Sequence, residues 1–397
     1  MNVINVIKDI NKDLLYKHIL RLEGTKNPIE TPDKLDEAAD YISNKFKEYG
    51  LQVAEHHFEI EGLDRIFRNI EGFIGNEDYS DILISSHYDT VINSPGANDN
   101  GTGIAVMLEA ARIIAKEHKN KNIRFICFSL EESNPAIELK RLKSAQKYQL
   151  LDKNYRPVSL RAADLIKNHR KIYRNLMDKG SILPEALQEA LNTLKSNLKP
   201  NEFNFFRELI NIYNIVDSFS TMGKTGLMGS SAWVATKFKS INKINCLINL
   251  DSVGYISNQK NSQQMPYGLK FKSFPNYKIK EKDSIGDFLV VIGDNNSKNL
   301  AYVFCNQCRL PSIDLSYVNI QPALSFDQIA KDLNMLLWAD HAPFWKNNVP
   351  ALFLTDTGDL RTPYEHTPAD TIDKLNFDFL EKVTKATIAT ITNIIAK

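Results

Sequence analysis

The sequence has little of several features that mark specialised classes of protein. It holds four cysteines in 397 residues, too few for a disulfide framework, and Cys127 and Cys246 stand inside apolar runs, where a small buried thiol is ordinary. Lys and Arg number 49 and Asp and Glu 48, which makes the formal net charge +1. This balance argues against a nucleic-acid-binding protein, which usually carries a strongly basic face.

Long apolar runs and export signals are also missing. The longest apolar stretches, such as 287–294 and 349–355, fall far short of the length that a membrane-spanning helix needs. The first residues, MNVINVIKDINKDLLYKHIL, mix acids and amides with apolar residues and lack the pattern of a secretory signal. We therefore expect a cytoplasmic protein with neither a nucleic-acid nor a membrane partner; a chain from which a signal was removed stays an alternative.

What the chain does have is an alternation of strand and helix patterns. Apolar runs typical of buried strands alternate with amphipathic stretches typical of helices. We expect strands at 52–60, 65–73, 81–87, 123–130, 244–250, 288–292 and 351–354, and helices at 32–49, 103–118, 298–308, 338–347 and 377–395. This order predicts an α/β fold: a three-layer α/β/α sandwich with a mixed, mostly parallel central sheet, plus a helical insertion.

Residues 133–224 break the alternation, because they contain helical patterns and no convincing strand. Lys and Arg number 16 here against 9 Asp and Glu, a net charge of +7, and the remaining 33 against 39 leave −6 for the rest of the chain. We expect residues 1–132 and 225–397 to form one catalytic domain and residues 133–224 to form the helical insertion.

Imidazoles and carboxylates stand at the carboxyl ends of the expected strands, where ligand sites of α/β sheets form. The segments are ILISSHYD, PGANDNGTG, IRFICFSLEE, INCLINLDSVGY and GDLRTPYEHTPADT, and their candidate residues are His87, Asp89, Asp99, Glu131, Glu132, Asp251 and His366. Uncompensated, so many neighbouring acids would repel one another and resist ionisation. A bound dication resolves this, and mixed histidine and carboxylate ligation without thiolate suits zinc or a similar transition metal.

Six short motifs carry a resemblance to a known family. In order, HYD, PGANDNGTG, LEE, NLDSVG, ADHAPF and PYEHTPADT resemble the zinc exopeptidases that include bacterial leucyl aminopeptidases, glutamate carboxypeptidase and glutaminyl cyclase. The resemblance implies two zinc ions: His87 and Asp251 would hold one, Glu132 and His366 the other, and Asp99 would bridge both. Each motif is weak alone, but six in the same order are specific together.

Two further acids have implied roles other than ligation. Glu131 would take a proton from the metal-bridging water and return it to the leaving amine, and Asp89 would orient His87. The pair Glu131–Glu132 is then adjacent because one acid ligates a metal while its neighbour reaches the water. An isolated pair of glutamates at a strand end would ordinarily be interpreted as solvated. The resemblance also implies a cis peptide bond after Asp99.

Residues near these motifs have more open roles. Asp340 and His341 match an Asp-His pair of the family, which would act beside the metals or the substrate, or serve packing alone. Tyr364 could polarise the scissile carbonyl. Many relatives, however, carry an aromatic residue directly before the histidine that His366 matches, and Glu365 occupies that place here.

The remaining histidines and the CxxC pair carry no signal of a site. Cys305 and Cys308 form a single CxxC on an expected helix, with no second pair to complete a zinc site. We interpret these cysteines as structural, and His18, His56, His57, His118 and His169 as structural or exposed.

The function that we expect is a di-zinc aminopeptidase acting on peptides. Alternatives are a glutaminyl-cyclase-like acyltransferase with one zinc, a carboxypeptidase acting on acidic C-termini, and an inactive binding module of the same fold. A further metallopeptidase family with a similar ligand order inserts a strand-containing dimerisation domain, which the helical insertion here speaks against. The cyclase and the binding module are disfavoured because the full ligand set is present.

The insertion begins where relatives continue directly. In relatives, the glutamate pair runs into a Gly-Leu-x-Gly-Ser turn, and here TGLMGSSAWV, residues 225–234, supplies this turn. We hypothesise a helical lid or wall that restricts access to short peptides, whose positive charge favours acidic ones. A solvated appendage or a contact between subunits is the alternative.

Overall fold

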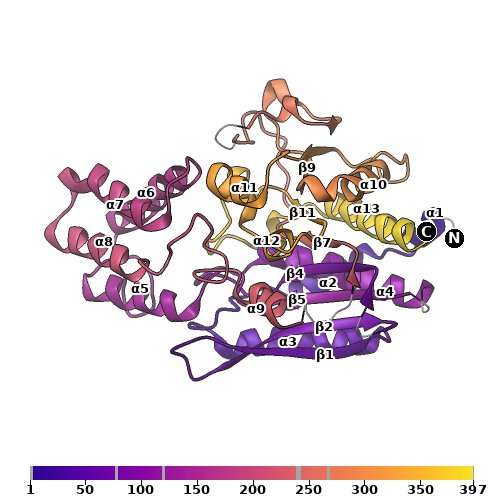
Figure 1. Cartoon of the computed structure of the whole chain (residues 1–397), viewed down its shortest axis with the longest axis horizontal. Coiled ribbons are helices and arrows are strands. Elements are labelled where there is room, and N and C mark those ends of the chain that lie inside the picture. The colour runs from indigo at the N-terminus through magenta and orange to yellow at the C-terminus, as the bar shows by residue number, and fades with distance from the viewer. Residues whose placement is uncertain (1–2, 77–78, 119–120, 238–242, 266–268, 397) are drawn as a thin grey trace.

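A computed structural model describes residues 3–76, 79–118, 121–237, 243–265 and 269–396 (Figure 1). Its centre is a nine-stranded sheet in the order β1-β2-β5-β4-β7-β11-β9-β10-β8. The strands are β1 (Gln52–Glu59), β2 (Ile66–Ile74), β4 (Ile82–His87), β5 (Ile123–Phe128), β7 (Leu247–Leu250), β8 (Asn276–Tyr277), β9 (Leu289–Gly293), β10 (Tyr317–Ile320) and β11 (Ala351–Thr355), with β3 (Tyr79–Ser80) and β6 (Lys243–Ile244) forming a separate pair.

The middle of the sheet is parallel and its flanks are mixed. The neighbouring strands β5, β4, β7 and β11 all run parallel. β2 pairs antiparallel with β5, β9 pairs antiparallel with β11, and β10 returns parallel to β9. The predicted fold class is therefore confirmed. Four parallel strands place their carboxyl ends at one edge of the sheet, so the loops that follow them meet there.

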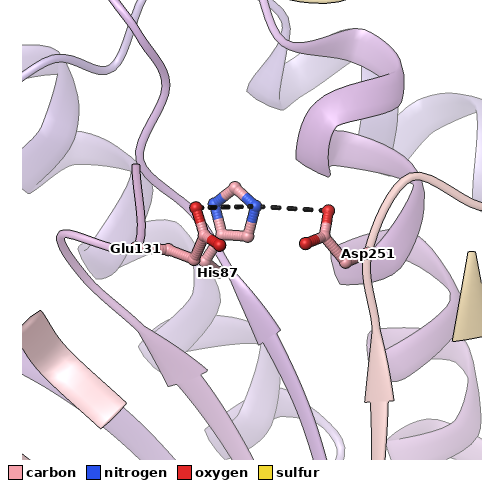
Figure 2. A group of neighbouring side chains, drawn as sticks. All are labelled: His87, Glu131 and Asp251. Carbon is pink, nitrogen blue, oxygen red and sulfur yellow. Dashed lines mark ion pairs between the residues drawn. The ribbon is translucent and has the colours of Figure 1, made fainter. Parts of the chain in front are cut away.

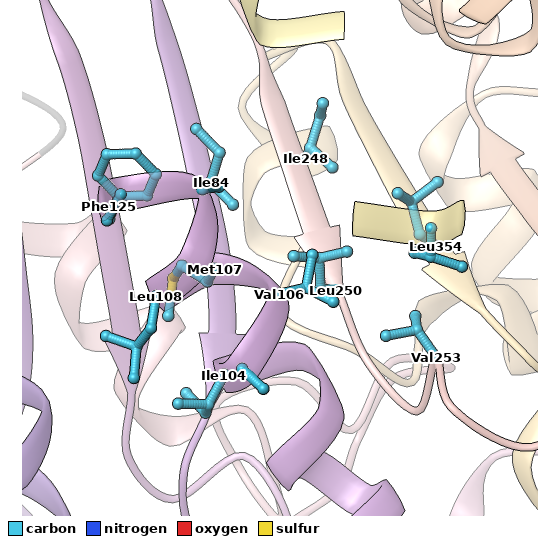
Figure 3. Packing of buried hydrophobic residues seen from close by; sticks show 14 of the residues in the cluster. Ile84, Ile104, Val106, Met107, Leu108, Phe125, Ile248, Leu250, Val253 and Leu354 are labelled. Carbon is cyan, nitrogen blue, oxygen red and sulfur yellow. The ribbon is translucent and has the colours of Figure 1, made fainter. Parts of the chain in front are cut away.

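The central strands bury both faces, which is why they read as continuous apolar runs. Successive side chains alternate between two cores: Ile84 and Phe125 enter one, and their neighbours Leu83 and Ile126 enter the other. Figure 3 shows the first of these cores, where side chains of β4, β5 and β7 face the apolar side of α4.

Helices cover each face. The first core is closed by α1 (Val3–Ile7), α2 (Lys12–Leu22), α3 (Pro32–Glu48), α4 (Gly103–Glu117), α10 (Lys298–Cys308) and α13 (Phe377–Ile395), and the second by α9 (Met228–Lys237), α11 (Phe326–Asp332) and α12 (Ala342–Lys346). Every helix in the described residues is too short or too polar to cross a bilayer.

The helix predicted at 338–347 is shorter than expected. It is α12, which starts at Ala342, and a separate 3-10 turn at Asn334–Leu337 precedes it. Pro343 lies in the first turn of α12. Proline fits there but lacks the N–H that a helix interior requires, so the helix cannot extend far upstream.

Residues 133–224 contain four helices: α5 (Pro135–Lys147), α6 (Leu160–Met177), α7 (Leu183–Leu194) and α8 (Pro200–Ile212). Figure 1 shows them beside the sandwich rather than within its layers. They enclose two small hydrophobic cores of their own. The two ends of the segment meet, because the backbone N–H of Asn134 donates to the carbonyl of Thr225 at 2.7 Å.

Candidate metal centre

The candidate residues converge at the carboxyl edge of the parallel strands. β4 ends at His87, Asp251 directly follows β7, and the loop after β11 carries His366. The pair Glu131–Glu132 follows β5 within one short turn, and the turn η1 (Ala97–Thr102) between β4 and α4 carries Asp99. The structure thus brings together all five residues that the resemblance implies as ligands, and Glu131 beside them.

His87 is surrounded by carboxylates. Its Nε2 atom lies 3.2 Å from Asp99 Oδ1, 3.5 Å from Asp251 Oδ1 and 4.0 Å from Glu131 Oε2. Figure 2 shows the ring between Glu131 and Asp251. The His87 side chain is 2% exposed, so these groups interact in a setting largely closed to water.

His366 forms a second centre of the same kind. Its Nε2 atom lies 3.0 Å from Asp99 Oδ2 and 3.0 Å from Glu132 Oε2, and Glu365 Oε1 lies 3.9 Å away. Asp99 therefore directs one carboxylate oxygen to each imidazole. This is the arrangement that a carboxylate bridging two cations requires.

The donor set fits two divalent metal ions. Ligands that share an ion at about 2.0–2.2 Å lie roughly 3–4 Å from one another, as the atoms around each imidazole do. Within the described residues, two buried atoms here, Nε2 of His87 and Oε1 of Glu132, have no hydrogen-bond partner. Buried polar atoms are rarely left so, and a cation would satisfy both.

Asp89 organises the centre more widely than expected. Its carboxylate accepts hydrogen bonds from the backbone N–H groups of Glu131 at 3.0 Å and Glu132 at 3.2 Å. Its backbone carbonyl accepts from Nδ1 of His87 at 3.2 Å, while its carboxylate lies 3.6 Å from that nitrogen. The donation from Nδ1 leaves Nε2 free to face a metal. One residue therefore positions both the imidazole and the glutamate pair.

The loop that carries Asp99 is held by residues for which the sequence indicated no role. Asp370 accepts from the backbone N–H groups of Asn98 at 2.9 Å and Asp99 at 3.1 Å. Asn100 Nδ2 donates to the carbonyl of Leu250 at 2.8 Å, which joins this loop to the end of β7. The implied cis peptide bond between Asp99 and Asn100 is confirmed.

Three site segments contain non-glycine residues in the left-handed region. They are Leu130 (φ 59°), Ser252 (φ 52°) and His366 (φ 55°). Such conformations cost on the order of 1 kcal/mol each and persist where the surroundings enforce them. Leu130 directly precedes Glu131, and Ser252 directly follows Asp251. These unfavourable backbone conformations therefore lie next to acids of the site.

Charge and burial shift the titration of the cluster. Burial disfavours a charged His87, but Glu131 and Asp251 outweigh it and raise its pKa well above the usual value. Burial also raises the pKa of Glu131 well above that of a free glutamate. For His366, burial is likewise outweighed, chiefly by Glu132, so that its pKa is raised. The buried carboxylates of the site therefore repel one another, and bound cations would offset this repulsion.

The residues with open roles lie in different surroundings. Asp340 is fully buried, and burial raises its pKa to about 7. His341 is buried against Phe353, with ring centroids 4.9 Å apart, and donates from Nε2 to the carbonyl of Leu336 at 2.8 Å. Tyr364 packs edge-on against Tyr255, with ring centroids 6.0 Å apart. No described contact joins His341 or Tyr364 to either imidazole of the centre.

The fold and this donor set define an α/β protein with a candidate two-metal centre at the carboxyl edge of its sheet. Residues 69–207 and 317–391, more than half of the chain, match the model of peptidase family M28, and the chain belongs to this family. It is therefore a zinc-dependent peptidase. The first matched span continues into residues 133–207, and the domain boundaries stay a prediction.

Several known proteins are similar to this chain in sequence or in fold. The chain is 22% identical over 394 residues to the Escherichia coli protein YfbL, covering 96% of this chain and 87% of that one. A 51-residue stretch, 13% of this chain and 11% of the relative, is 53% identical to Bacillus subtilis aminopeptidase YwaD. The fold is similar to the Legionella pneumophila aminopeptidase LapA, with a TM-score of 0.56, 16% identity, and coverage of 100% of this chain and 75% of that one.

A glutaminyl cyclase shares the fold to the same degree. The structure of the Porphyromonas gingivalis enzyme matches with a TM-score of 0.54 and 15% identity, covering 97% of this chain and 98% of that chain. At such identities the likeness concerns the fold alone. The type of reaction therefore depends on the residues of the centre.

Proposed function

We propose that the protein is a di-zinc aminopeptidase that hydrolyses N-terminal residues from peptides. The observation that carries this proposal is the position of Asp99, with one oxygen 3.2 Å from His87 and the other 3.0 Å from His366. His87 and Asp251 would hold one ion, Glu132 and His366 the other, and Asp99 both. Bound zinc ions supply Lewis acidity, which polarises a carbonyl and makes a water nucleophilic at neutral pH.

The chain's own residues then move the proton. Glu131 is largely buried, and its Oε2 lies 4.0 Å from Nε2 of His87, at the edge of the centre. Burial raises its pKa above that of a free glutamate, which makes the ionised carboxylate a stronger base. Glu131 accepts the proton of the attacking water and donates it to the leaving amine. Asp89 accepts from the backbone N–H groups of both Glu131 and Glu132, and so fixes the position of the base relative to the neighbouring ligand.

A cyclase-like acyltransferase is the second candidate, because the fold matches a glutaminyl cyclase over nearly the full length of both chains. The two imidazoles, each with its own carboxylate, favour two ions over one. Emission spectroscopy of the purified protein separates the candidates. Two zinc ions per chain support the peptidase, one supports the cyclase, and none supports an inactive binding module.

The Glu131→Gln variant tests the mechanism. We expect it to lower the release of amino acids from a free-amine peptide library by about 100- to 10,000-fold, since general-base catalysis contributes on this scale. It should retain the metal content of the wild type, because the proposal assigns Glu131 to proton transfer. Glu131 lies close enough to His87 and Asp251 to share an ion with them, so a loss of metal in the variant would assign it as a ligand instead. Glu61→Gln, at an exposed position between β1 and β2, is the matched control and should leave activity unchanged. Peptide hydrolysis that survives in Glu131→Gln would overturn this role.

A further inference from the structure

Glu365 is an acid for which the proposed reaction has no role. Its side chain is 17% exposed and lies at the His366 side of the centre, with Oε1 3.9 Å from Nε2 of His366. Gly358 makes room for it: a Cβ added at Gly358 would collide with the Glu365 carboxylate. Gly358 also has a φ of +50°, a conformation that residues with a Cβ rarely adopt.

This carboxylate lies farther from His366 than the other two acids do, although Asp99, Glu365 and His366 together could share one ion. Around Nε2 of His366, Asp99 and Glu132 lie at 3.0 Å and Glu365 at 3.9 Å. Glu365 is also more exposed than Glu132, whose side chain is 6% exposed. Its side chain is therefore the more accessible of the two to a substrate.

Within the described residues, Glu365 has no cation of the chain other than His366 within ion-pair distance. Its Oε2 atom is buried without a hydrogen-bond partner, and so is Oε1 of the nine-tenths-buried Glu132 beside the same imidazole. Five carboxylates lie around the two imidazoles, those of Asp99, Glu131, Glu132, Asp251 and Glu365. Glu365 is the most exposed of the five, so a cation of the substrate can reach it more readily than the others.

We propose that Glu365 receives a positively charged nitrogen of the substrate. This inference rests on the proposed peptidase function for the nature of the substrate. The shared chemistry is an ammonium group near the scissile bond, which either the free α-amine or a basic side chain can supply. Glu365 would thus favour positively charged substrates, whereas an aromatic residue at this position would not.

The test uses binding that does not depend on turnover. Titration calorimetry of the zinc-loaded protein with n-hexylamine, a monocation, and n-hexanol, its neutral counterpart, measures recognition of charge directly. We expect Glu365→Gln to weaken hexylamine binding by about 10- to 100-fold, as for a hydrogen bond to a charged group, and to change hexanol binding less than about twofold. Glu61→Gln, which removes an exposed acid between β1 and β2, is the control, and it should leave both affinities unchanged.

Two comparisons between pairs of substrates identify which ammonium group Glu365 binds. A loss of preference for leucine p-nitroanilide over its N-acetyl form in Glu365→Gln assigns the α-amine, and a loss of preference for lysine over norleucine assigns the side chain. Unchanged hexylamine binding overturns the proposal, even where the wild type hydrolyses peptides. A loss of one zinc ion from Glu365→Gln also overturns it, because Glu365 is then a ligand. Glu365-dependent amine binding in a protein that hydrolyses no peptide supports the cation site and refutes the proposed function alone.

Discussion

At the scale of single residues, the centre depends on acids that bind backbone rather than metal. Asp89 and Asp370 each accept two backbone N–H groups, one at the glutamate pair and one at the Asp99 loop. A carboxylate offers two acceptor oxygens and can hold two consecutive amides at once. These contacts set the positions of Glu131, Glu132 and Asp99 before any ion binds.

Replacement of Asp370 by Asn tests this support. The side-chain amide of Asn has one acceptor oxygen, so the backbone N–H of either Asn98 or Asp99 would lose its partner. We expect zinc affinity, measured by competition with a chelator, to fall by about 10- to 100-fold, as for other residues that hold ligands in place. Asp373→Asn removes an acid nearby that is 64% exposed, and it should bind zinc like the wild type. Equal affinity in Asp370→Asn would show that the loop holds its shape unaided.

Sequence motifs located some of the site residues but not the partners of others. His87, Asp99 and His366 could be located because each stands in a motif at a strand end or in the loop after one. Asp370 lies in the quoted motif PYEHTPADT, but no pattern reveals that a carboxylate accepts from backbone amides far away in sequence. His18 was interpreted only as structural or exposed, yet it is buried between the hydroxyls of Tyr41 at 2.7 Å and Tyr49 at 3.1 Å. Such partners come from tertiary packing.

At the scale of elements, long periodic segments and the short, strongly apolar strands β7, β9 and β11 were predictable, and two other short elements were not. The helices at 298–308 and 377–395 begin and end as expected, because their apolar stripes extend over several turns. β10 has only four residues and α11 only seven, and neither was expected. Elements this short carry too few repeats of the pattern, and packing against neighbours determines them.

Helix α6 holds a buried histidine that makes its stability depend on pH. The ring of His169 stacks on Phe206 with centroids 4.2 Å apart, and burial lowers its pKa to about 4. An unfolded histidine titrates near 6.5, so between these values the unfolded state binds more protons and folding weakens as pH falls. From pH 7 to pH 5 this contribution amounts to about 2 kcal/mol.

Amide hydrogen exchange of α6 and α8 in the wild type and in His169→Phe measures this term. Asp178 has the opposite sign, because burial raises its pKa to about 6 and it gains a proton in the folded state first. The difference between the two proteins therefore isolates the histidine. We expect wild-type protection relative to the variant to drop on acidification, and an identical pH response of both proteins would contradict the assignment.

At the scale of the whole molecule, the helices of residues 133–224 are attached to the sandwich on several sides. Arg174 of α6 pairs with Asp359 at 3.1 Å, close in sequence to the loop that carries His366. Asn334 Nδ2 donates to the carbonyl of Phe219 at 2.6 Å. On the other side, Ile29 and Ile92 pack against the larger core of the four helices. Residues 133–224 thus contact segments that lie between site residues in sequence: Ile92 between His87 and Asp99, and Asn334 and Asp359 between Asp251 and His366. A wall around the site would make such contacts.

Removal of this segment leaves the buried residues of the two main cores in place and takes away only partly buried side chains that pack against them, those of Ala136, Phe219 and Met222. The fully buried residues of the two cores on either side of the sheet all lie outside 133–224, and the hydrogen bond between Asn134 and Thr225 shows that the ends adjoin. A variant in which a short Gly-Ser linker replaces residues 135–223 should therefore fold and retain its zinc. We expect its kcat/KM for octapeptides to rise relative to that for dipeptides, because a wall limits substrate length.

The charge of the segment provides a second readout from the same variant. Its net charge of +7 against −6 for the remainder should attract acidic peptides at low ionic strength, so the deletion should lower kcat/KM for an acidic tripeptide relative to a neutral one, and 0.5 M salt should diminish that difference. If neither length nor charge preference changes in a deletion variant with full zinc content, the four helices are an appendage. Where the deletion does change the length preference, the Arg174→Ala variant distinguishes the sources, because it removes the contacts of α6 with Asp359 and with the ring of Trp338. A change in length preference in this variant assigns the effect to the position of α6 beside the site rather than to the bulk of the segment.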